Sequence, residues 1–379
     1  MVTMSPGRIC AKEYILVVPT IRENCFRDFI GRWNEVGLFD HCDLIIMEDN
    51  PERTFDAESL FPSDGNTPNW IIRRGGLIHY SWSDIERVLG DDSWIIPRRS
   101  DTVRSFGYLM AYSDRCPFIL TLDDDCYPDP NAGYADAKGF LDLHRQALEK
   151  SRWMNTLNSV KPRGVPFYNL GHNDRIMVNH GLWTNVLDYD APTQLAAPIP
   201  EKFSFDNRIV PANSYFPMCG MNVMWKREAT VLMYHLLMGR EICAQKDARM
   251  QNALGVYEPI TNKLPFDRFG DIWAGIIMKK ILDRYEYNVS TGTPYIRHER
   301  ASNPFTNLKK EANGIEVNEN FWEYVDSFST DSGTLEEAYL EMGSHIIKFT
   351  QFPEYNSYFE KLGIAMQTWA KIFMGFEGQ

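Results

Sequence analysis

Three consecutive carboxylates end a short apolar stretch of this 379-residue chain. The stretch runs from Phe118 to Leu122, and Asp123, Asp124 and Asp125 follow it directly. Their mutual repulsion is costly unless a cation neutralises it, and Mg²⁺ or Mn²⁺ commonly joins one or two carboxylates to substrate phosphates. An exposed acidic turn is the simpler alternative. Because the run follows an apolar strand directly, we predict a metal-diphosphate site there.

Polar residues also stand at other predicted strand ends. Asp49 follows a second apolar run and could accept a hydrogen bond from a uracil N–H, whereas arginines could pair with a diphosphate. The residues predicted to bind substrate on this ground are Thr20, Arg22, Asp49, Arg99, Arg104 and Asp123. The alternative for each is that it only terminates a strand or caps a helix. Because they all stand at predicted strand ends, a substrate-binding site is favoured over this alternative.

A further metal ligand should come from elsewhere in the chain, because one short run rarely fills an octahedral shell without substrate and water. His298, at the end of the segment from Thr291, is the candidate. A lone histidine is more often a surface or packed residue.

The elements that must position these groups alternate along the chain. Apolar runs at Tyr14–Val18 and Cys42–Met47 predict strands, and Asn24–Gly37 between them has apolar residues at near-helical spacing. A strand at Ser93–Pro97 and a helix after Asp101 should lead to the strand that ends in the carboxylates. Such alternation indicates an α/β fold with a parallel or mixed sheet and helices on both faces.

The second half of the chain should be richer in helices. We predict helices at Ala229–Met238 and Ile272–Arg284, and Thr334 with Glu337 forms a capping-box pattern. A final helix has one apolar face, formed by Tyr358, Leu362, Met366, Trp369 and Phe373. We therefore expect a catalytic domain over residues 1–320 and a helical extension over 321–379 that packs on the body or on a partner subunit.

Composition narrows the class of protein. Hydrophobic residues make up 44% and charged residues 24%, as in ordinary globular proteins. The net charge of −12 disfavours a broad nucleic-acid surface. The seven cysteines form no C-x-x-C pair, so reduced thiols in a cytoplasmic protein are the simpler expectation.

Targeting and cofactor motifs are not seen. Met1–Tyr14 lacks a charged start followed by an apolar core, so we expect no secretory signal. No apolar stretch approaches the ~18 residues of a membrane span. The chain shows no Gly-x-Gly-x-x-Gly and no phosphate-loop motif, which argues against a flavin or nicotinamide cofactor.

Nine segments match a known family in order, from Ile15 to about Trp322. They are ILVVPTIR at 15–22, TLDDDC at 121–126, HGLW at 180–183, DYDAPTQL at 188–195, FPMCGMN at 216–222, DIWAG at 271–275, TPY at 293–295, ASNPF at 301–305 and NLKK at 307–310. Together they resemble the reversibly glycosylated polypeptide family, whose best-known members are plant UDP-arabinopyranose mutases. Long ordered matches are far more specific than the Asp run alone.

The resemblance implies a glycosyltransferase-A-like, Rossmann-related mixed sheet flanked by helices, with a helical C-terminal extension. It also implies a UDP-sugar substrate, Mn²⁺ or Mg²⁺, interconversion of pyranose and furanose rings, and assembly into homo- or hetero-oligomers. His180, Trp183 and Asn222 lie in the matching segments and are added to the predicted substrate-binding residues. Asp271 or the loop from Asp188 to Asp190 would stabilise positive charge that develops on the sugar.

The chain departs from the family pattern at two places. Plant members carry two arginines before the His-Gly-Leu-Trp segment and attach sugar to the first, but only the second has a counterpart here, Arg163. We predict that Arg163 contacts phosphate or accepts sugar transiently. The family also has an adjacent acid pair where this chain keeps only Asp271, with Asp267 as the possible substitute.

Two other functions remain open. One is a metal-dependent glycosyltransferase that moves sugar from a UDP-sugar to an external acceptor, which the missing acceptor arginine would fit. The other is a non-catalytic assembly subunit, against which the intact Asp run argues.

Overall fold

The computed structural model describes residues 12–61, 76–150, 153, 163–166, 168, 171, 173–196, 206–242, 261–300 and 302–377. Within these residues one nine-stranded mixed sheet has the order β3-β2-β1-β4-β8-β6-β11-β5, and β7 pairs with β11. The strands are β1 Tyr14–Thr20, β2 Cys42–Glu48, β3 Leu77–Tyr80, β4 Phe118–Leu122, β5 Cys126–Pro128, β6 Ile176–Asn185, β7 Asn207–Ile209, β8 Asn222–Lys226 and β11 Asn288–His298. Two short strands, β9 Arg240–Ile242 and β10 Thr261–Lys263, form a separate pair.

Strand β1 lies inside the sheet and is buried on both faces. It pairs in parallel with β2 on one side and with β4 on the other. Successive side chains of a strand point to opposite faces, so Ile15 and Val17 enter one hydrophobic core and Leu16 and Val18 enter the other. Burial on both faces explains why this segment is a continuous apolar run.

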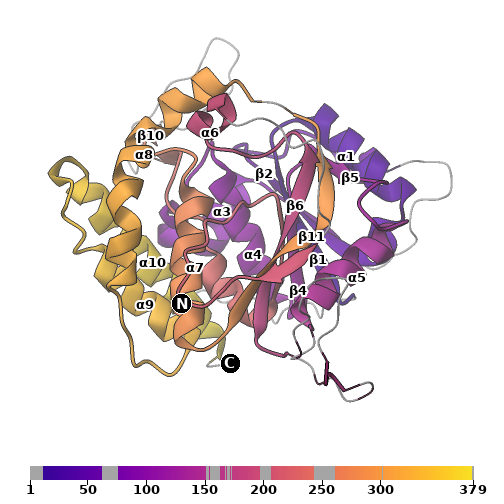
Figure 1. The fold of residues 1–379 in the computed structure, drawn as a ribbon. Helices are drawn as coiled ribbons and strands as arrows, with labels where there is room; N and C mark the ends of the chain where they lie inside the picture. The colour runs from indigo at the N-terminus through magenta and orange to yellow at the C-terminus, as the bar shows by residue number, and fades with distance from the viewer. Residues whose placement is uncertain are drawn as a thin grey trace, which may run out of the picture.

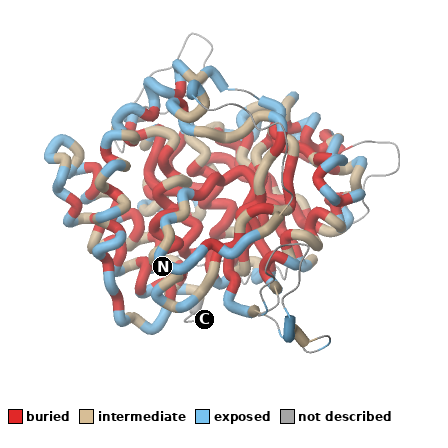
Figure 2. Tube along the Cα trace, in the orientation of Figure 1, coloured by how far each residue is buried: buried red, intermediate tan, exposed pale blue. Residues whose placement is uncertain are grey.

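Helices cover both faces of the sheet, and the buried residues fill the space between the layers (Figures 1 and 2). Trp33 of α1 (Glu23–Glu35) and Phe140 of α5 (Ala137–Leu148) belong to the core on one face. The other core includes Ile85 of α3 (Trp82–Leu89), Phe106 of α4 (Arg104–Ser113) and Trp273 of α7 (Gly270–Arg284). A short helix, α6 (Ala191–Ala196), lies against α8.

The C-terminal helices belong to this second core. They are α8 Pro304–Asp326, α9 Leu335–Ile346 and α10 Asn356–Glu377. The predicted apolar face of the last helix is confirmed, because Tyr358, Leu362, Met366, Trp369 and Phe373 are all buried. Thr334 caps α9, since its Oγ1 accepts a hydrogen bond from Glu337 N at 3.2 Å. The predicted boundary at residue 320 falls inside α8, and a division into two domains stays a prediction.

The topology confirms the predicted class, an α/β, Rossmann-related mixed sheet flanked by helices with a helical C-terminal extension. Two predicted elements are wrong. Ser93–Pro97 is not a strand: Gly90–Ile95 forms a 3₁₀ helix, and Ile95 and Ile96 fill the core beside the sheet. Ala229–Met238 is not an α-helix: a 3₁₀ helix covers Arg227–Met233, and irregular chain follows it. All residues from Ala229 to Met238 are buried.

Two further observations concern the whole of the described chain. Its helices include none that combines the length and the hydropathy needed to cross a membrane. The five described cysteines, Cys25, Cys42, Cys116, Cys126 and Cys219, are free thiols.

Candidate active site

A cavity of about 930 Å³ lies where β1, β2 and β4 end, and the start of α8 closes it on another side. Because parallel strands end at one edge of the sheet, residues that are far apart in sequence meet there. Of the fifteen residues predicted to form the site, all except Arg163 and Asn222 line this cavity. They are Thr20, Arg22, Asp49, Arg99, Arg104, Asp123, Asp124, Asp125, His180, Trp183, Asp190, Asp271 and His298.

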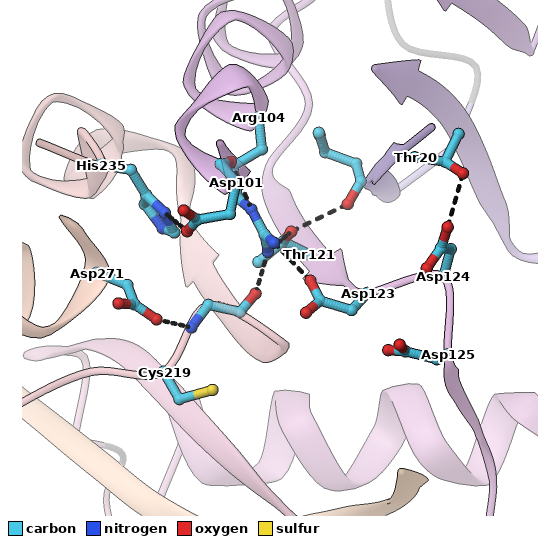
Figure 3. Close-up of polar contacts among 12 residues, drawn as sticks. Thr20, Asp101, Arg104, Thr121, Asp123, Asp124, Asp125, Cys219, His235 and Asp271 are labelled. Carbon is cyan, nitrogen blue, oxygen red and sulfur yellow. Dashed lines mark hydrogen bonds and ion pairs between the residues drawn. The ribbon is translucent and has the colours of Figure 1, made fainter. Parts of the chain in front are cut away.

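Asp124 turns inward and joins the ends of β4 and β1 (Figure 3). Thr20 Oγ1 donates a hydrogen bond to Asp124 Oδ2 at 2.6 Å, and Arg22 forms an ion pair with Asp124 Oδ1. Burial raises the pKa of Asp124, and the two donors act against that shift. Since both carboxylate oxygens already have partners, this geometry favours a supporting role, and its predicted metal binding stays a prediction.

Asp125 faces His298 across the edge of the sheet. Strand β5 runs antiparallel to β11 with Cys126 opposite His298, and this register brings Asp125 Oδ1 to 3.7 Å from His298 Nε2. His298 Nδ1 lies 3.0 Å from the carbonyl oxygen of Val186. A carbonyl only accepts, so Nδ1 carries the proton and Nε2 of the neutral ring presents a lone pair. Burial and the charge of Asp123 raise the pKa of Asp125 to about 6.

This pair fits a hard divalent cation. A histidine whose second nitrogen donates to a backbone carbonyl is the arrangement seen in metal ligands. Among the described residues, no three His, Cys, Asp or Glu side chains form a group that could hold a metal ion. An ion beside Asp125 and His298 would therefore take most of its ligands from diphosphate oxygens and water, as is usual for Mg²⁺, and metal binding by Asp123 stays a prediction.

Arg104 is the centre of the hydrogen-bonded framework beneath the cavity (Figure 3). Its side chain is 2% exposed and pairs with Asp123 Oδ1 at 2.5 Å. Its other donors reach Asp101 O at 3.0 Å, Thr121 Oγ1 at 3.3 Å and the carbonyl oxygen of Gly220. Because these acceptors occupy the guanidinium, Arg104 orients Asp123, and its predicted pairing with a diphosphate stays a prediction.

Asp49 organises the loop that begins at Arg99. It accepts hydrogen bonds from Trp82 Nε1 at 2.7 Å and from the backbone N–H groups of Arg99 and Ser100, each at 3.0 Å. The Arg99 guanidinium lies 5.0 Å from the Trp82 ring centroid and donates to Asn50 Oδ1 at 3.3 Å. Burial raises the pKa of Asp49. Both residues remain at the cavity wall, where the uracil and the diphosphate were predicted to bind.

His180 supports the loop that follows Phe216. Cys219 N donates to His180 Nε2 at 3.2 Å, so the other ring nitrogen carries the proton and donates to Thr291 Oγ1 at 3.2 Å. Burial lowers the pKa of His180 to about 4, which keeps the ring neutral. The ring also makes an edge contact with Trp183 at 5.7 Å. His180 therefore positions neighbouring residues of the cavity.

A second group of acids lies at the start of α7. Asp271 accepts hydrogen bonds from Gly220 N at 3.1 Å and Ile272 N at 2.9 Å. Burial, with the charges of Asp101 and Asp188, raises the pKa of Asp271 to about 8. The raised pKa favours the protonated form of Asp271. Asp188 accepts a hydrogen bond from Cys219 Sγ at 2.9 Å.

Three residues that were predicted to act in the site lie apart from the two groups described above. Asp190 is exposed and caps α6, since its Oδ1 accepts a hydrogen bond from Thr193 N at 2.8 Å. Asn222 is buried outside the cavity and donates to the carbonyl oxygens of Leu182 and Pro294, both at 3.0 Å. Arg163 is exposed and is not brought to the cavity. The structure thus gives Asn222 a structural environment, and the roles of Asp190 and Arg163 stay predictions.

Sequence reasoning missed several residues that line the cavity. They include Asp101, Arg268, Arg300, Lys310 and Glu311, whereas Asp188 lies on the loop that was predicted to stabilise positive charge on the sugar. Some lie within or beside the matching family segments, which was the available signal. Among the described residues, the lining contains ten aspartates and glutamates but six lysines and arginines. A diphosphate would add negative charge, so a divalent cation would offset the repulsion.

Comparison with known proteins identifies relatives along nearly the whole chain. A family model described as reversibly glycosylated polypeptide matches residues 9–377. "Probable UDP-arabinopyranose mutase 1" of Pisum sativum is 32% identical over 389 residues, which cover 97% of this chain and 92% of that protein. "UDP-arabinopyranose mutase 1" of Arabidopsis thaliana is 32% identical over 376 residues, with 95% and 92% covered.

Among solved structures, glucosyl-3-phosphoglycerate synthase from Mycobacterium tuberculosis, in complex with Mn²⁺, UDP and glucosyl-3-phosphoglycerate, aligns with a TM-score of 0.41 and 12% identity. The alignment covers 82% of this chain and 80% of that one.

Proposed function

Because this chain belongs to the reversibly glycosylated polypeptide family, we propose that it is a UDP-sugar mutase that interconverts the pyranose and furanose forms of the nucleotide-linked sugar. The observation that carries the proposal is the match of residues 9–377 to the family model. The names of the relatives that are 32% identical to it support a substrate like UDP-arabinopyranose. The reaction is an isomerisation and needs no redox cofactor.

We further propose that Asp123, Asp125 and His298 hold Mn²⁺ or Mg²⁺ together with the diphosphate. A bound divalent cation would neutralise charge on the departing diphosphate. Support comes from the lone pair of His298 Nε2, which faces Asp125 Oδ1 at 3.7 Å, and from the acidic lining of the cavity. Arg104 holds Asp123 in place from below.

The chemistry exchanges bonds at the anomeric carbon of the sugar. The bond from this carbon to the β-phosphate oxygen breaks, and its electron pair leaves with UDP. Another sugar hydroxyl then bonds to the carbon and loses its proton, which gives a bicyclic intermediate. The original ring oxygen takes a proton and leaves the carbon with the electron pair of its bond, so that only the new ring remains. Finally the same phosphate oxygen bonds to the carbon again, so atoms and electrons balance.

Asp271 is the group proposed to deliver the proton. Its pKa of about 8 leaves it protonated at neutral pH, and it stands at the cavity wall beside Asp188. Asp188, or Asp190 on the same loop, would stabilise the positive charge on the sugar. These roles rest on position and on the direction of the pKa shift.

The direct test is to incubate the purified protein with Mn²⁺ and UDP-arabinopyranose, UDP-galactose or UDP-glucose. Chromatography separates pyranose from furanose products, and intact-mass measurement detects attached sugar. We expect furanose from at least one donor and an unmodified protein mass. No furanose from any donor would refute the mutase proposal for these sugars.

One observation favours a second function. Arg163 lies outside the cavity and the first arginine of the family pattern has no counterpart, so transfer to an external acceptor is the alternative. Release of UDP only when an acceptor is added would identify such a glycosyltransferase. Failure to bind UDP with metal would instead indicate an assembly subunit.

We also propose that the protein works in the cytoplasm as a homo- or hetero-oligomer. The free thiols of the described cysteines are typical of a reducing compartment. Light scattering on the eluting protein would measure the oligomer, and a monomeric mass at working concentration would contradict this part of the proposal.

A further inference from the structure

Arg268 is a cation of the cavity wall with donors that the other described residues leave unused. Its side chain is 32% exposed and lines the cavity. Nε donates to Glu311 Oε1 at 2.6 Å, and Nη2 is 4.0 Å from Asp188 Oδ1, which is too far for a hydrogen bond. Within the described chain, Nη1 and Nη2 have no hydrogen-bond acceptor.

A buried carboxylate fixes this guanidinium. The side chain of Glu311, on α8, is 3% exposed, and its second oxygen accepts a hydrogen bond from Ala191 N at 2.7 Å. Glu311 thus ties Arg268 to the starts of α6 and α8. The Arg268 backbone also has φ of 65°, a region that non-glycine residues seldom adopt. Such a conformation persists where its surroundings enforce it, and it is often found at ligand sites.

The other cations near the cavity differ from Arg268. Arg104 and Arg22 are engaged by the carboxylates of the Asp run, and Arg99 binds Asp49 O and Asn50. Arg300 and Lys310 are exposed, and no buried partner holds either within the described chain. Arg22 is equally exposed and its Nε also has no partner, but its Nη2 is held by Asp124 and Asp125. Within the described residues, Arg268 keeps both terminal nitrogens unused and is fixed through Nε by a buried carboxylate.

We propose that Arg268 binds the diphosphate of the nucleotide in the cavity that Asp125 and His298 also line. A guanidinium is permanently charged, and its planar N–H groups match two phosphate oxygens at once. Asp188 is near both groups, because Arg268 Nη2 lies 4.0 Å from its Oδ1 and the charges of His298 and Asp123 also act on its pKa. Arg268 would then stabilise the charge that grows on the phosphate as UDP leaves.

This inference rests on the proposed function, because it takes UDP as the ligand. The test is calorimetric titration of the full-length protein with UDP and with uridine, both in the presence of Mg²⁺. Asn tolerates positive φ, so Arg268→Asn removes the guanidinium while keeping the backbone. Arg115→Asn is the matched control, since Arg115 has φ of 60° and is exposed just before β4, at the other end of that strand.

We expect R268N to weaken UDP binding about 10- to 100-fold, the size expected for charge-assisted hydrogen bonds, and to leave uridine binding unchanged. E311Q should weaken UDP binding less, because it loosens the guanidinium without removing it. R115N should bind both ligands like the wild type. If R268N binds UDP as tightly as the wild type, or loses uridine equally, the inference is overturned. A wild-type protein that binds neither ligand would overturn the proposed function as well.

Discussion

Carboxylates that are adjacent in sequence have different tasks in this site. Asp124 is bound by Thr20 and Arg22 and joins two strands, whereas Asp125 faces His298 with an oxygen directed at an imidazole lone pair. Asp123, the first of the run, pairs with Arg104 and is 30% exposed. A metal ligand must keep an oxygen free, so the three positions should respond differently to substitution.

Replacing His298 tests the metal site. We expect His298→Ala to lower turnover roughly 100-fold and to abolish Mn²⁺ binding in the presence of UDP, because the carboxylates alone leave the ligand set incomplete. Paramagnetic resonance of Mn²⁺ measures this binding independently of turnover. His41→Ala, at a partly exposed position just before β2, is the control. Wild-type Mn²⁺ affinity in H298A would exclude His298 as a ligand.

The pH dependence of turnover tests Asp271. Its pKa is raised to about 8, so the proton is present below that pH and is lost above it. We expect the turnover number to fall as pH rises through about 8. Asp271→Asn should lower turnover by about 10²–10⁴-fold and remove this alkaline limb, since general acids typically contribute that much.

The pH profiles also show whether Asp271 or Asp267 is the proton donor. Asp267→Asn should keep the alkaline limb if Asp271 is the proton donor. If D271N keeps the limb and D267N loses it, the assignment moves to Asp267.

At the scale of elements, α7 sets the position of the loop that lines the cavity. A Cβ added at Gly275 would lie 2.3 Å from Met218 N and 2.6 Å from Phe216 O, both backbone atoms. The helix and the loop can therefore touch only through a glycine. Since Gly220 of the same segment is bound by Asp271 and Arg104, a shift of this loop would move both parts of the site.

The glycine contact can be tested with two alanine variants. Gly275→Ala should destabilise the protein by about 1–3 kcal/mol through overpacking, and should lower turnover as the loop moves. Gly31→Ala, on α1, meets nothing within 4 Å and should stabilise by about 0.5–1 kcal/mol through helix propensity. Urea unfolding gives both values, and a stabilised, fully active G275A would show that the contact is unimportant.

For the whole molecule, the C-terminal helices and the sheet share one core. Trp369 of α10 is fully buried, stacks on Tyr234 at 5.0 Å and donates to Val231 O at 2.9 Å. Tyr358 OH of the same helix donates to Leu237 O at 2.7 Å. These contacts make the extension part of the structure that supports the site.

We therefore expect Trp369→Ala to destabilise the whole protein by about 3–5 kcal/mol, in a single unfolding transition. Ile364→Ala, on the same helix but 41% exposed, should change the free energy of unfolding by less than about 0.5 kcal/mol. Urea unfolding followed by both fluorescence and circular dichroism measures the change. Two separate transitions would mean that the helices form an independent unit.

Local patterns in the sequence determined the strands β1, β2 and β4, the run of carboxylates after β4 and the apolar face of α10. Such features depend on neighbours within a few residues. Apolar residues that recur every two residues indicate a strand, and those that recur every 3.6 residues indicate a helix. The matching segments likewise identified most residues of the cavity. Where the apolar pattern had no clear period, at Ser93–Pro97 and Ala229–Met238, the prediction of a regular element was wrong.

The tertiary structure alone decided which way each polar side chain faces. Asp124 turns toward Thr20, 104 residues away, and Gly220 is held by Arg104, 116 residues away, so no local pattern could separate these residues from Asp125. Pairing of β5 with β11 brings His298 to Asp125, and packing of α8 brings Glu311 to Arg268. The sequence supplies the charged groups, and the register of distant strands and helices determines which of them meet a partner and which face the cavity.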